Sequence, residues 1–390
     1  MPHLNAFPLG AAVTLDQLER DPHPVLAGLR AAEPVSWLPA LEGWLVTRHD
    51  LALGVMRDSE TFTVEDPRFS TGQVIGPSML SLDGNEHARH RAPFVGPFRP
   101  IQVRDRFAEA TGAAVNALID ELQPAGRAEL RRAFAGPLAA LIVARALGLR
   151  EGEVAVVLSW YDAIVASVTS ITAGAGLTRD GERAFAALSE RLREVIADGR
   201  GASLLAAVAA GSELSVEQII SNAAVLLFGG IETTEGMIAN AVLALLERPA
   251  QLELVRAEPA LVEAAIEESL RLEPAAAVID RYATADVQLA GAPINAGELV
   301  RVSISAANRD PAVFAAPEAF DLRRAGLRRH IAFAQGPHVC VGIHLARLEA
   351  RVALSSLLTR LPGLRLDPER RSEVRGLVFR KPLELHVLWG

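Results

Sequence analysis

The single cysteine of this 390-residue chain, Cys340, lies in the stretch that most constrains the fold. The residues before it include the turn formers Gly336 and Pro337, and the residues from Ile343 onward follow a helical pattern. A tight loop that leads into a helix places the thiol near free N–H groups and the positive end of the helix dipole, and both stabilise a thiolate. Glycine at 336 and again at Gly342 lets a large flat group approach the backbone closely.

A free cysteine is most often a small buried hydrophobic residue, so the sequence around Cys340 must decide whether it has another role. From Phe333 to Arg347 the order is Phe-x-x-Gly-x-His-x-Cys-x-Gly-x-x-Leu-Ala-Arg, which resembles the haem-ligand loop of the cytochrome P450 family of haem-thiolate monooxygenases. The pattern is long and specific, and it favours a ligand over a core residue. Ala334 stands where the family usually has glycine, a departure that concerns the backbone turn and not the ligand.

A long helix with an unusual centre is the second constrained stretch. Ser215-Val216-Glu217-Gln218 is a capping box that predicts a helix start, and the apolar residues after it predict a buried helix to about Leu246. Gly229-Gly230 and Thr233-Thr234 place poor helix formers at its middle. Glycine lets a flat ligand touch the backbone, and a threonine hydroxyl can bond a preceding carbonyl and loosen the helix. The alternative is close helix packing at the glycines, with Glu232 in a structural ion pair.

Two shorter residue spacings are uninformative alone and indicate a function only together with these two stretches. His87 and Arg91 are four residues apart and share a helix face, which suits a pair of carboxylates, although a solvated basic face has the same pattern. Glu268 and Arg271 are three apart and can pair, as in any surface helix. The resemblance implies a haem-propionate clamp for the first spacing, and for the second a structural lock that also includes Arg324.

The resemblance also implies the cofactor site. It implies haem b, with the Cys340 thiolate as the axial iron ligand that favours O–O cleavage. The acid–threonine pair Glu232 and Thr233 would face the iron, order water and deliver protons during oxygen activation. The residues implied to bind the cofactor are, for the propionates, His87, Arg91, Arg281 and His338, and, beside the ring, Phe333, Gly229 and Gly230.

The implied reaction is the insertion of one oxygen atom from O2 into an apolar small molecule, by hydroxylation, epoxidation or dealkylation. By position, the substrate-pocket candidates are Val225, Phe228, Ala277, Ile279 and Val378. They are apolar and carry no charged anchor, so we expect an apolar substrate. The chain has no flavin or iron–sulfur segment, so electrons would come from a separate ferredoxin and its reductase. Arginines that could form a local docking surface are Arg99, Arg104, Arg328 and Arg329.

Other functions remain open at this point. A peroxide-driven enzyme of the same fold would carry an arginine–proline pair in place of Glu232 and Thr233. An unusual catalyst of the same family that performs coupling or nitration is a further alternative. A haem-bound sensor without turnover would need neither the proton relay nor a roomy pocket.

The expected fold is mainly α with a smaller β region, arranged as one compact prism-like domain over residues 1–390. We expect helices over about 83–272 and strands at about 34–47, 275–304 and 373–389. The four ordered motifs span about residues 83–347.

The charge, the cysteine count and the first residues of the chain argue against several other classes of protein. The net charge of −8 gives no sign of a nucleic-acid partner. One cysteine excludes an internal disulfide or a zinc cluster and fits a reducing compartment. The first residues, Met1-Pro2-His3-Leu4-Asn5, show no basic segment leading into a long apolar run, so we expect no membrane association and a cytoplasmic location.

Overall fold

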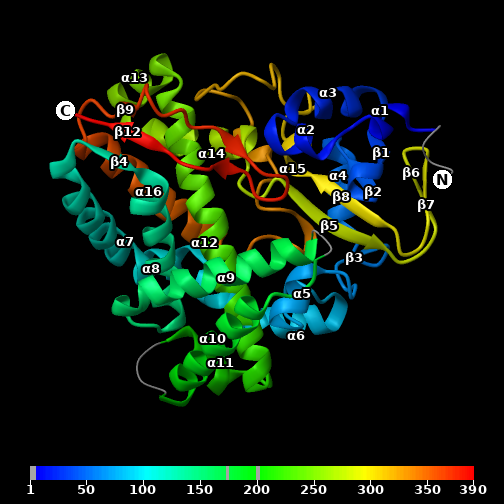
Figure 1. Ribbon diagram of the computed structural model, residues 1–390, viewed down its shortest axis with the longest axis horizontal. Helices are drawn as coiled ribbons and strands as arrows, with labels where there is room; N and C mark the ends of the chain where they lie inside the picture. Colours follow the sequence, from blue (N-terminus) through cyan, green and yellow to red (C-terminus); the bar gives the residue numbers. More distant parts are fainter. Residues whose placement is uncertain (1–5, 173–174, 199–202) are drawn as a thin grey trace.

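The computed structural model describes residues 6–172, 175–198 and 203–390. A helix-rich region and a strand-rich region lie side by side, with the helix α12 running through the centre (Figure 1). The expectation of a mainly α fold with a smaller β region is confirmed. The helices are α1 (Pro8–Ala11), α2 (Leu15–Arg20), α3 (His23–Ala32), α4 (His49–Arg57), α5 (Ser70–Ile75), α6 (Gly84–Val95), α7 (Pro100–Leu122), α8 (Gly136–Leu147), α9 (Val154–Thr172), α10 (Arg179–Asp198), α11 (Leu204–Gly211), α12 (Val216–Leu246), α13 (Pro249–Ala257), α14 (Val262–Leu272), α15 (Ile304–Ala307) and α16 (Ile343–Arg360).

The strands form one five-stranded sheet, in the order β1-β2-β8-β5-β3, and three smaller sheets. In the large sheet β2 pairs in parallel with β8, so the beginning of the chain is joined to a segment more than 250 residues later. The expected strand regions correspond to β1 and β2, to β5–β8 and to β10–β12. The strands are β1 (Val35–Leu38), β2 (Gly43–Val46), β3 (Phe62–Thr63), β4 (Arg127–Glu129), β5 (Val278–Ala283), β6 (Val287–Leu289), β7 (Ala292–Ile294), β8 (Leu299–Ser303), β9 (Arg365–Leu366), β10 (Val374–Arg375), β11 (Lys381–Pro382) and β12 (His386–Leu388).

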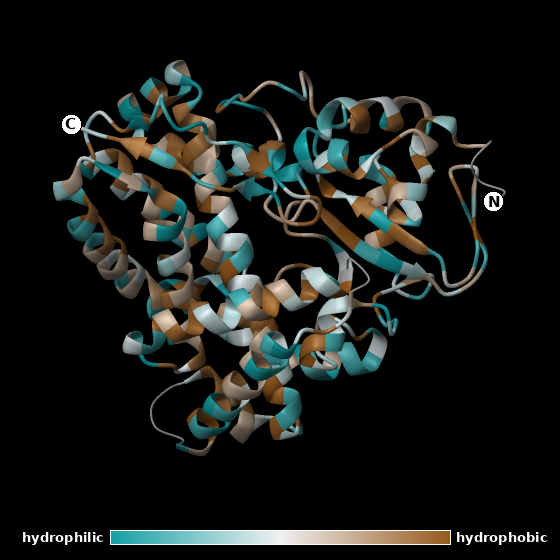
Figure 2. Cartoon of the chain, viewed as in Figure 1, coloured by the Kyte–Doolittle hydropathy of each residue, from teal (hydrophilic) through white to brown (hydrophobic). Residues whose placement is uncertain are grey.

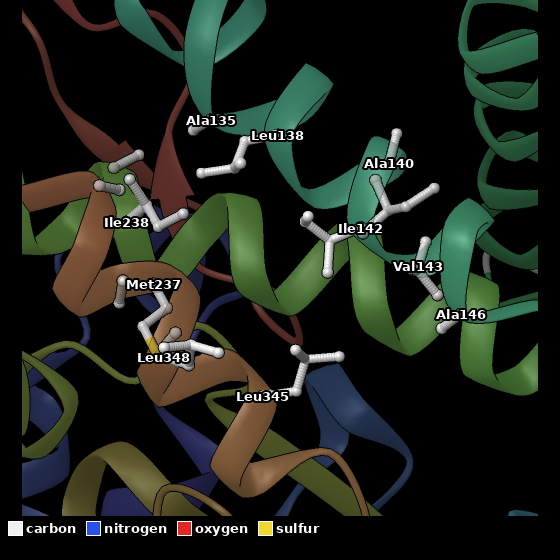
Figure 3. Packing of buried hydrophobic residues seen from close by; sticks show 14 of the residues in the cluster. Ala135, Leu138, Ala140, Ile142, Val143, Ala146, Met237, Ile238, Leu345 and Leu348 are labelled. Carbon is white, nitrogen blue, oxygen red and sulfur yellow. The ribbon is translucent and has the colours of Figure 1, made fainter. Parts of the chain in front are cut away.

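Helix α12 is the centre of the hydrophobic core. Its capping box forms, because the Ser215 hydroxyl accepts from the Gln218 N–H and the Gln218 side chain accepts in return. It contacts α8, α14 and α16 among others, and Figure 3 shows Ile142 and Val143 of α8 beside it and Leu345 of α16 nearby. Most of its residues are buried, so this helix is stabilised mainly by packing.

The outer helices have the amphipathic pattern that packing on one side requires. The buried residues of α10 recur at three- and four-residue intervals, and hydrophilic and hydrophobic residues mix along it in Figure 2. By length and hydropathy alone, one stretch of the described residues, Glu151–Ile171, is long and apolar enough to cross a membrane. In this fold that stretch packs against α5, α8 and α10.

A buried ion network joins α14 to the segment that follows the large sheet. Glu268 and Arg271 are both fully buried and form two hydrogen bonds of 2.7 and 2.8 Å. Arg324 donates to the same Glu268 carboxylate at 2.9 Å, as the sequence suggested. Arg271 also donates to three backbone carbonyls between residues 308 and 319. The network therefore fixes the long loop that leads to Cys340.

Candidate functional site

The loop before Cys340 is held in a fixed shape by its own backbone. The Cys340 N–H donates to the Phe333 carbonyl at 2.9 Å, and the Ala334 N–H donates to the Ile331 carbonyl at 2.9 Å. At Gly336, φ is +76° and an added Cβ would lie 2.4 Å from the carbonyl oxygen of residue 56 on α4. Only glycine fits there, because both the conformation and the close approach exclude a side chain.

The environment of Cys340 acts on its thiol in two directions. Burial has the largest effect and raises the pKa of the Cys340 thiol above its ordinary value, although the Gly342 N–H and the guanidinium groups of Arg91 and Arg347 partly oppose it. Helix α16 begins three residues later, at Ile343. A metal ion bound to the sulfur would reverse the effect of burial, because a coordinating thiol loses its proton.

A second ion network fixes the same loop from the other side. Arg347 donates two hydrogen bonds of 2.6 and 2.7 Å to Glu267, and the His330 ring lies 3.0 Å from the same carboxylate. Burial opposes ionisation of Glu267, but the bonds from His330 and Arg347 outweigh it and lower the pKa of Glu267 to about 2. The Arg347 guanidinium also lies over the Phe333 ring, 4.7 Å from its centroid. Glu267 and His330 were not predicted from the sequence, in which only the neighbouring Glu268 could have drawn attention to them.

The two glycines of α12 have different surroundings. At Gly229 an added Cβ would meet no atom within 4 Å, whereas at Gly230 it would lie 2.9 Å from Val143 of α8. Gly230 therefore permits close helix packing, which was the alternative interpretation, and Gly229 faces open space. The Thr233 hydroxyl donates to the Gly229 carbonyl at 2.6 Å, the bond that the sequence suggested.

Three basic groups lie buried or half-buried without a carboxylate partner among the described residues. His87 is 5% exposed, and its Nε2 has no hydrogen-bond partner in the part of the chain that the structure describes. Arg281 is 4% exposed and donates to the neighbouring Asp280 carbonyl. Arg91 is half-buried and donates to the Val339 carbonyl beside Cys340. Burial and the nearby His338 and Arg91 lower the pKa of His87 to about 4, so its ring is neutral at pH 7.

His338 differs from these three groups because it already has an acidic partner. Its Nε2 lies 2.8 Å from Asp83, which also accepts from the Thr63 hydroxyl and the Val64 N–H. The His338 and His87 rings are 4.3 Å apart. His338 therefore joins the basic cluster but uses one ring nitrogen for Asp83, which the sequence did not reveal.

Glu232 is buried and lies in an ion pair. Its Oε1 is 2.7 Å from the Nζ of Lys381, in β11 near the end of the chain. Lys381 also pairs with Glu235, which lies 3.1 Å from the Nε of Arg131. A structural ion pair for Glu232 was the alternative prediction from the sequence, but its partner was not predicted.

The substrate-pocket candidates separate into two groups. Phe228 packs edge-on against Phe379, with ring centroids 5.6 Å apart, and Tyr161 lies 6.5 Å away. Val225 is buried on the same helix. Ala277 instead is 1% exposed and lines a small cavity with Leu18 and Leu26.

An isolated backbone pairing joins the segment of Ala277 to the segment of Val378. The Ala277 N–H donates to the Val378 carbonyl, whereas Ala276 and Phe379 form the bridge. Phe379 is thus the residue that reaches α12, one position beyond the candidate Val378. Ile279 is half-buried and packs in the cluster of the large sheet.

Comparison with known proteins identifies the family. The cytochrome P450 family model matches residues 193–373. The chain is 37% identical to nocardicin C N-oxygenase of Nocardia uniformis subsp. tsuyamanensis, with 98% of each chain covered. It is 35% identical to cytochrome P450 monooxygenase PikC of Streptomyces venezuelae, with 89% of this chain and 85% of that protein covered. The structure of P450BioI in complex with an acyl carrier protein is similar at a TM-score of 0.87 and 29% identity, covering 96% of this chain and 100% of that chain.

The chain therefore belongs to the cytochrome P450 family and has its fold. It is a haem-thiolate monooxygenase, an oxidoreductase that acts on small molecules with O2 and electrons from redox partners. Membership of this enzyme family favours a catalyst over the haem-bound sensor without turnover that was an alternative from the sequence. The fit of the residues to haem rests on the open space at Gly229 and on the three basic groups, since basic groups that have no carboxylate partner among the described residues suit the propionates.

The residue that departs from the family pattern, Ala334, yields a stability prediction. Its φ of +57° lies in the left-handed region, which costs alanine roughly 1–2 kcal/mol. Ala334→Gly removes this strain and should raise the free energy of unfolding by about 1 kcal/mol. The gain is smaller than the full strain energy, because glycine loses more chain entropy on folding than alanine does. Denaturant unfolding measures the change. Ala332→Gly, in the same loop but without a positive φ, should lower the stability; equal losses in both variants would contradict the assignment.

Proposed function

We propose that Cys340 is the axial ligand of haem b and that His87, Arg91 and Arg281 bind its propionates. The observation that carries this proposal is the set of three basic groups that lack carboxylate partners among the described residues. Arg91 bonds to the carbonyl next to Cys340, so one side chain would connect the ligand loop to a propionate. His338 would use its second ring nitrogen, and Phe333 would lie beside the ring. Gly229 would leave room for the cofactor at α12.

Removing one propionate partner tests this arrangement. Arg281→Gln should weaken haem retention by tenfold or more, because a charge-assisted hydrogen bond contributes about 1.5–3 kcal/mol. The measurement is the transfer of haem to excess apomyoglobin, and the pyridine haemochrome spectrum identifies haem b. Arg301→Gln, on the neighbouring strand and paired with Asp280, is the control. Loss of haem that is equal in both variants would argue for a general effect on the sheet.

In the proposed mechanism the bound haem supplies the oxidising chemistry, and the thiolate favours O–O cleavage. The residues of the chain handle protons and exclude water. In the structure the Thr233 hydroxyl donates to the Gly229 carbonyl. During the reaction this hydroxyl would hydrogen-bond to O2 and order a water molecule beside it. Glu232 would supply protons from the buried side of α12. Phe228 and Phe379 would keep this space apolar, which fits insertion of one oxygen atom into an apolar small molecule.

The role of Thr233 gives a second prediction. Thr233→Ala should retain haem and bind substrate, but product formed per reductant consumed should fall several-fold while released hydrogen peroxide rises, because proton delivery is impaired. Stoichiometry of reductant, product and peroxide measures this. Thr234→Ala, the adjacent buried threonine, should keep its coupling. Undiminished coupling in Thr233→Ala would sink the proposed role.

We also propose a small ferredoxin, with its reductase, as the electron donor. A surface cavity of about 520 Å³ beside the Cys340 loop is lined by Ile331 and Gln335 together with the arginines Arg48, Arg57, Arg328 and Arg329. Asp50, which pairs with Arg48, and Asp310 also line it, so the arginines outnumber the carboxylates. Of the arginines considered from the sequence, Arg328 and Arg329 lie there, whereas Arg99 and Arg104 do not line it. A cluster of cations near the ligand loop would attract an acidic partner and guide its encounter.

Charge reversal at this cavity tests the docking surface. Arg328→Glu should slow reduction by an acidic ferredoxin about tenfold at low salt and weaken the salt dependence of the rate. Stopped-flow reduction under carbon monoxide measures it. Arg145→Glu, an exposed arginine of α8 that is paired with Glu151, is the control. Equal rates and equal salt dependence for Arg328→Glu and the wild type would exclude this surface.

We propose a cytoplasmic location, because the only thiol of the chain must stay reduced to bind iron. Fractionation of the native host followed by detection of the protein tests it.

A further inference from the structure

Lys381 is the only lysine among the 39 lysine and arginine residues of the chain. Its side chain is 12% exposed and lies between two acidic residues of α12. The Nζ atom is 2.7 Å from Oε1 of Glu232 and also pairs with Oε2 of Glu235. One ammonium group therefore joins two carboxylates that are one helical turn apart.

The surrounding helices are shaped to admit this cluster. At Gly236 of α12 an added Cβ would lie 3.5 Å from the Cβ of Lys381 and 2.9 Å from the Cβ of residue 275. Glycine at this position therefore lets the strand β11, which carries Lys381, lie close to α12. At Gly136 of α8 an added Cβ would lie 3.1 Å from the Glu235 carboxylate. Asn240 of α12 donates to the carbonyl of residue 380 at 2.9 Å and so fixes the backbone next to Lys381.

The far end of the cluster leads to the surface. Arg131 begins the π-helical turn Arg131–Ala135, and its Nε lies 3.1 Å from Oε1 of Glu235. Its Nη1 donates to the carbonyl of Leu383, a residue that is 63% exposed. Two acids and two bases thus alternate from Glu232 to the surface, and their charges balance, as buried charges require.

The chemistry of lysine suits such a position. Its ammonium group is compact and can direct three donors at two carboxylates, and it can lose a proton, whereas arginine stays charged. We propose that Lys381 is a positioning residue for the monooxygenase reaction: it holds the Glu232 carboxylate in place, and Glu235 and Arg131 extend this ion network toward the surface, so that proton delivery by Glu232 depends on Lys381. This inference rests on the proposed role of Glu232.

Because it is the only lysine, Lys381 can be observed directly. Holoenzyme grown with ¹⁵N-lysine and held in the diamagnetic ferrous carbon-monoxide form should give one side-chain ammonium signal. We expect Glu235→Gln to shift this signal and to speed exchange of its protons with water. Glu247→Gln, at the exposed end of α12, is the matched control and should leave the signal in place. An identical signal in the wild type and in Glu235→Gln would overturn the proposed bridge.

Kinetics then tests the link to proton delivery. Lys381→Met, which keeps the length of the side chain but removes the charge, should lower turnover by about tenfold, less than the ~10²–10⁴ of a proton-transferring group itself. Its solvent deuterium isotope effect should rise, while substrate affinity from the spin-state titration stays unchanged. Lys381→Arg should restore part of the turnover. A purely structural role would not raise the isotope effect.

The outcomes separate this inference from the proposed function. If Glu232→Gln impairs turnover and Lys381→Met shows wild-type turnover and isotope effect, the role of Lys381 is wrong and that of Glu232 stands. If Glu232→Gln turns over normally, both are wrong. Should Lys381→Met fail to fold, the isotope effect of Glu235→Gln decides in its place: a raised value supports the positioning role of the ion network, and a wild-type value overturns it.

Discussion

The ion network of Glu267 is the interaction on which the proposed site depends. A thiolate can act as an axial ligand only if its loop has one conformation and its charge is stabilised. Arg347 and His330 bind the same buried carboxylate from the two ends of the loop, and the Arg347 guanidinium partly opposes the rise in the pKa of the Cys340 thiol that burial causes. The loop is therefore anchored to α14, whose next residue, Glu268, anchors the segment leading to it.

Helix α12 is buried along most of its length but contains poor helix formers near its middle. Its apolar residues stabilise the fold, while Gly229 and Thr233 give up helix stability where the helix faces open space. One turn of this helix also carries Glu232 and Glu235, whose buried charges require cations from distant parts of the chain. The same helix is thus the main support of the core and the element at which we place oxygen chemistry.

Short sequence patterns predicted the structural features that depend only on neighbouring residues. The capping box at Ser215, the bond from Thr233 to the Gly229 carbonyl and the helix after Cys340 follow from spacing within one segment. Pairings between distant segments could not be read in this way. The contact of Lys381 with Glu232 joins residues about 150 positions apart.

Ligation of haem iron by the Cys340 thiolate is the central claim, and the absorption spectrum of the reduced protein under carbon monoxide tests it most directly. The account predicts the red-shifted Soret band of thiolate-bound haem, and its loss in Cys340→Ser. A band like that of a histidine-ligated globin in the wild type, or a red-shifted band that persists in Cys340→Ser, would contradict it.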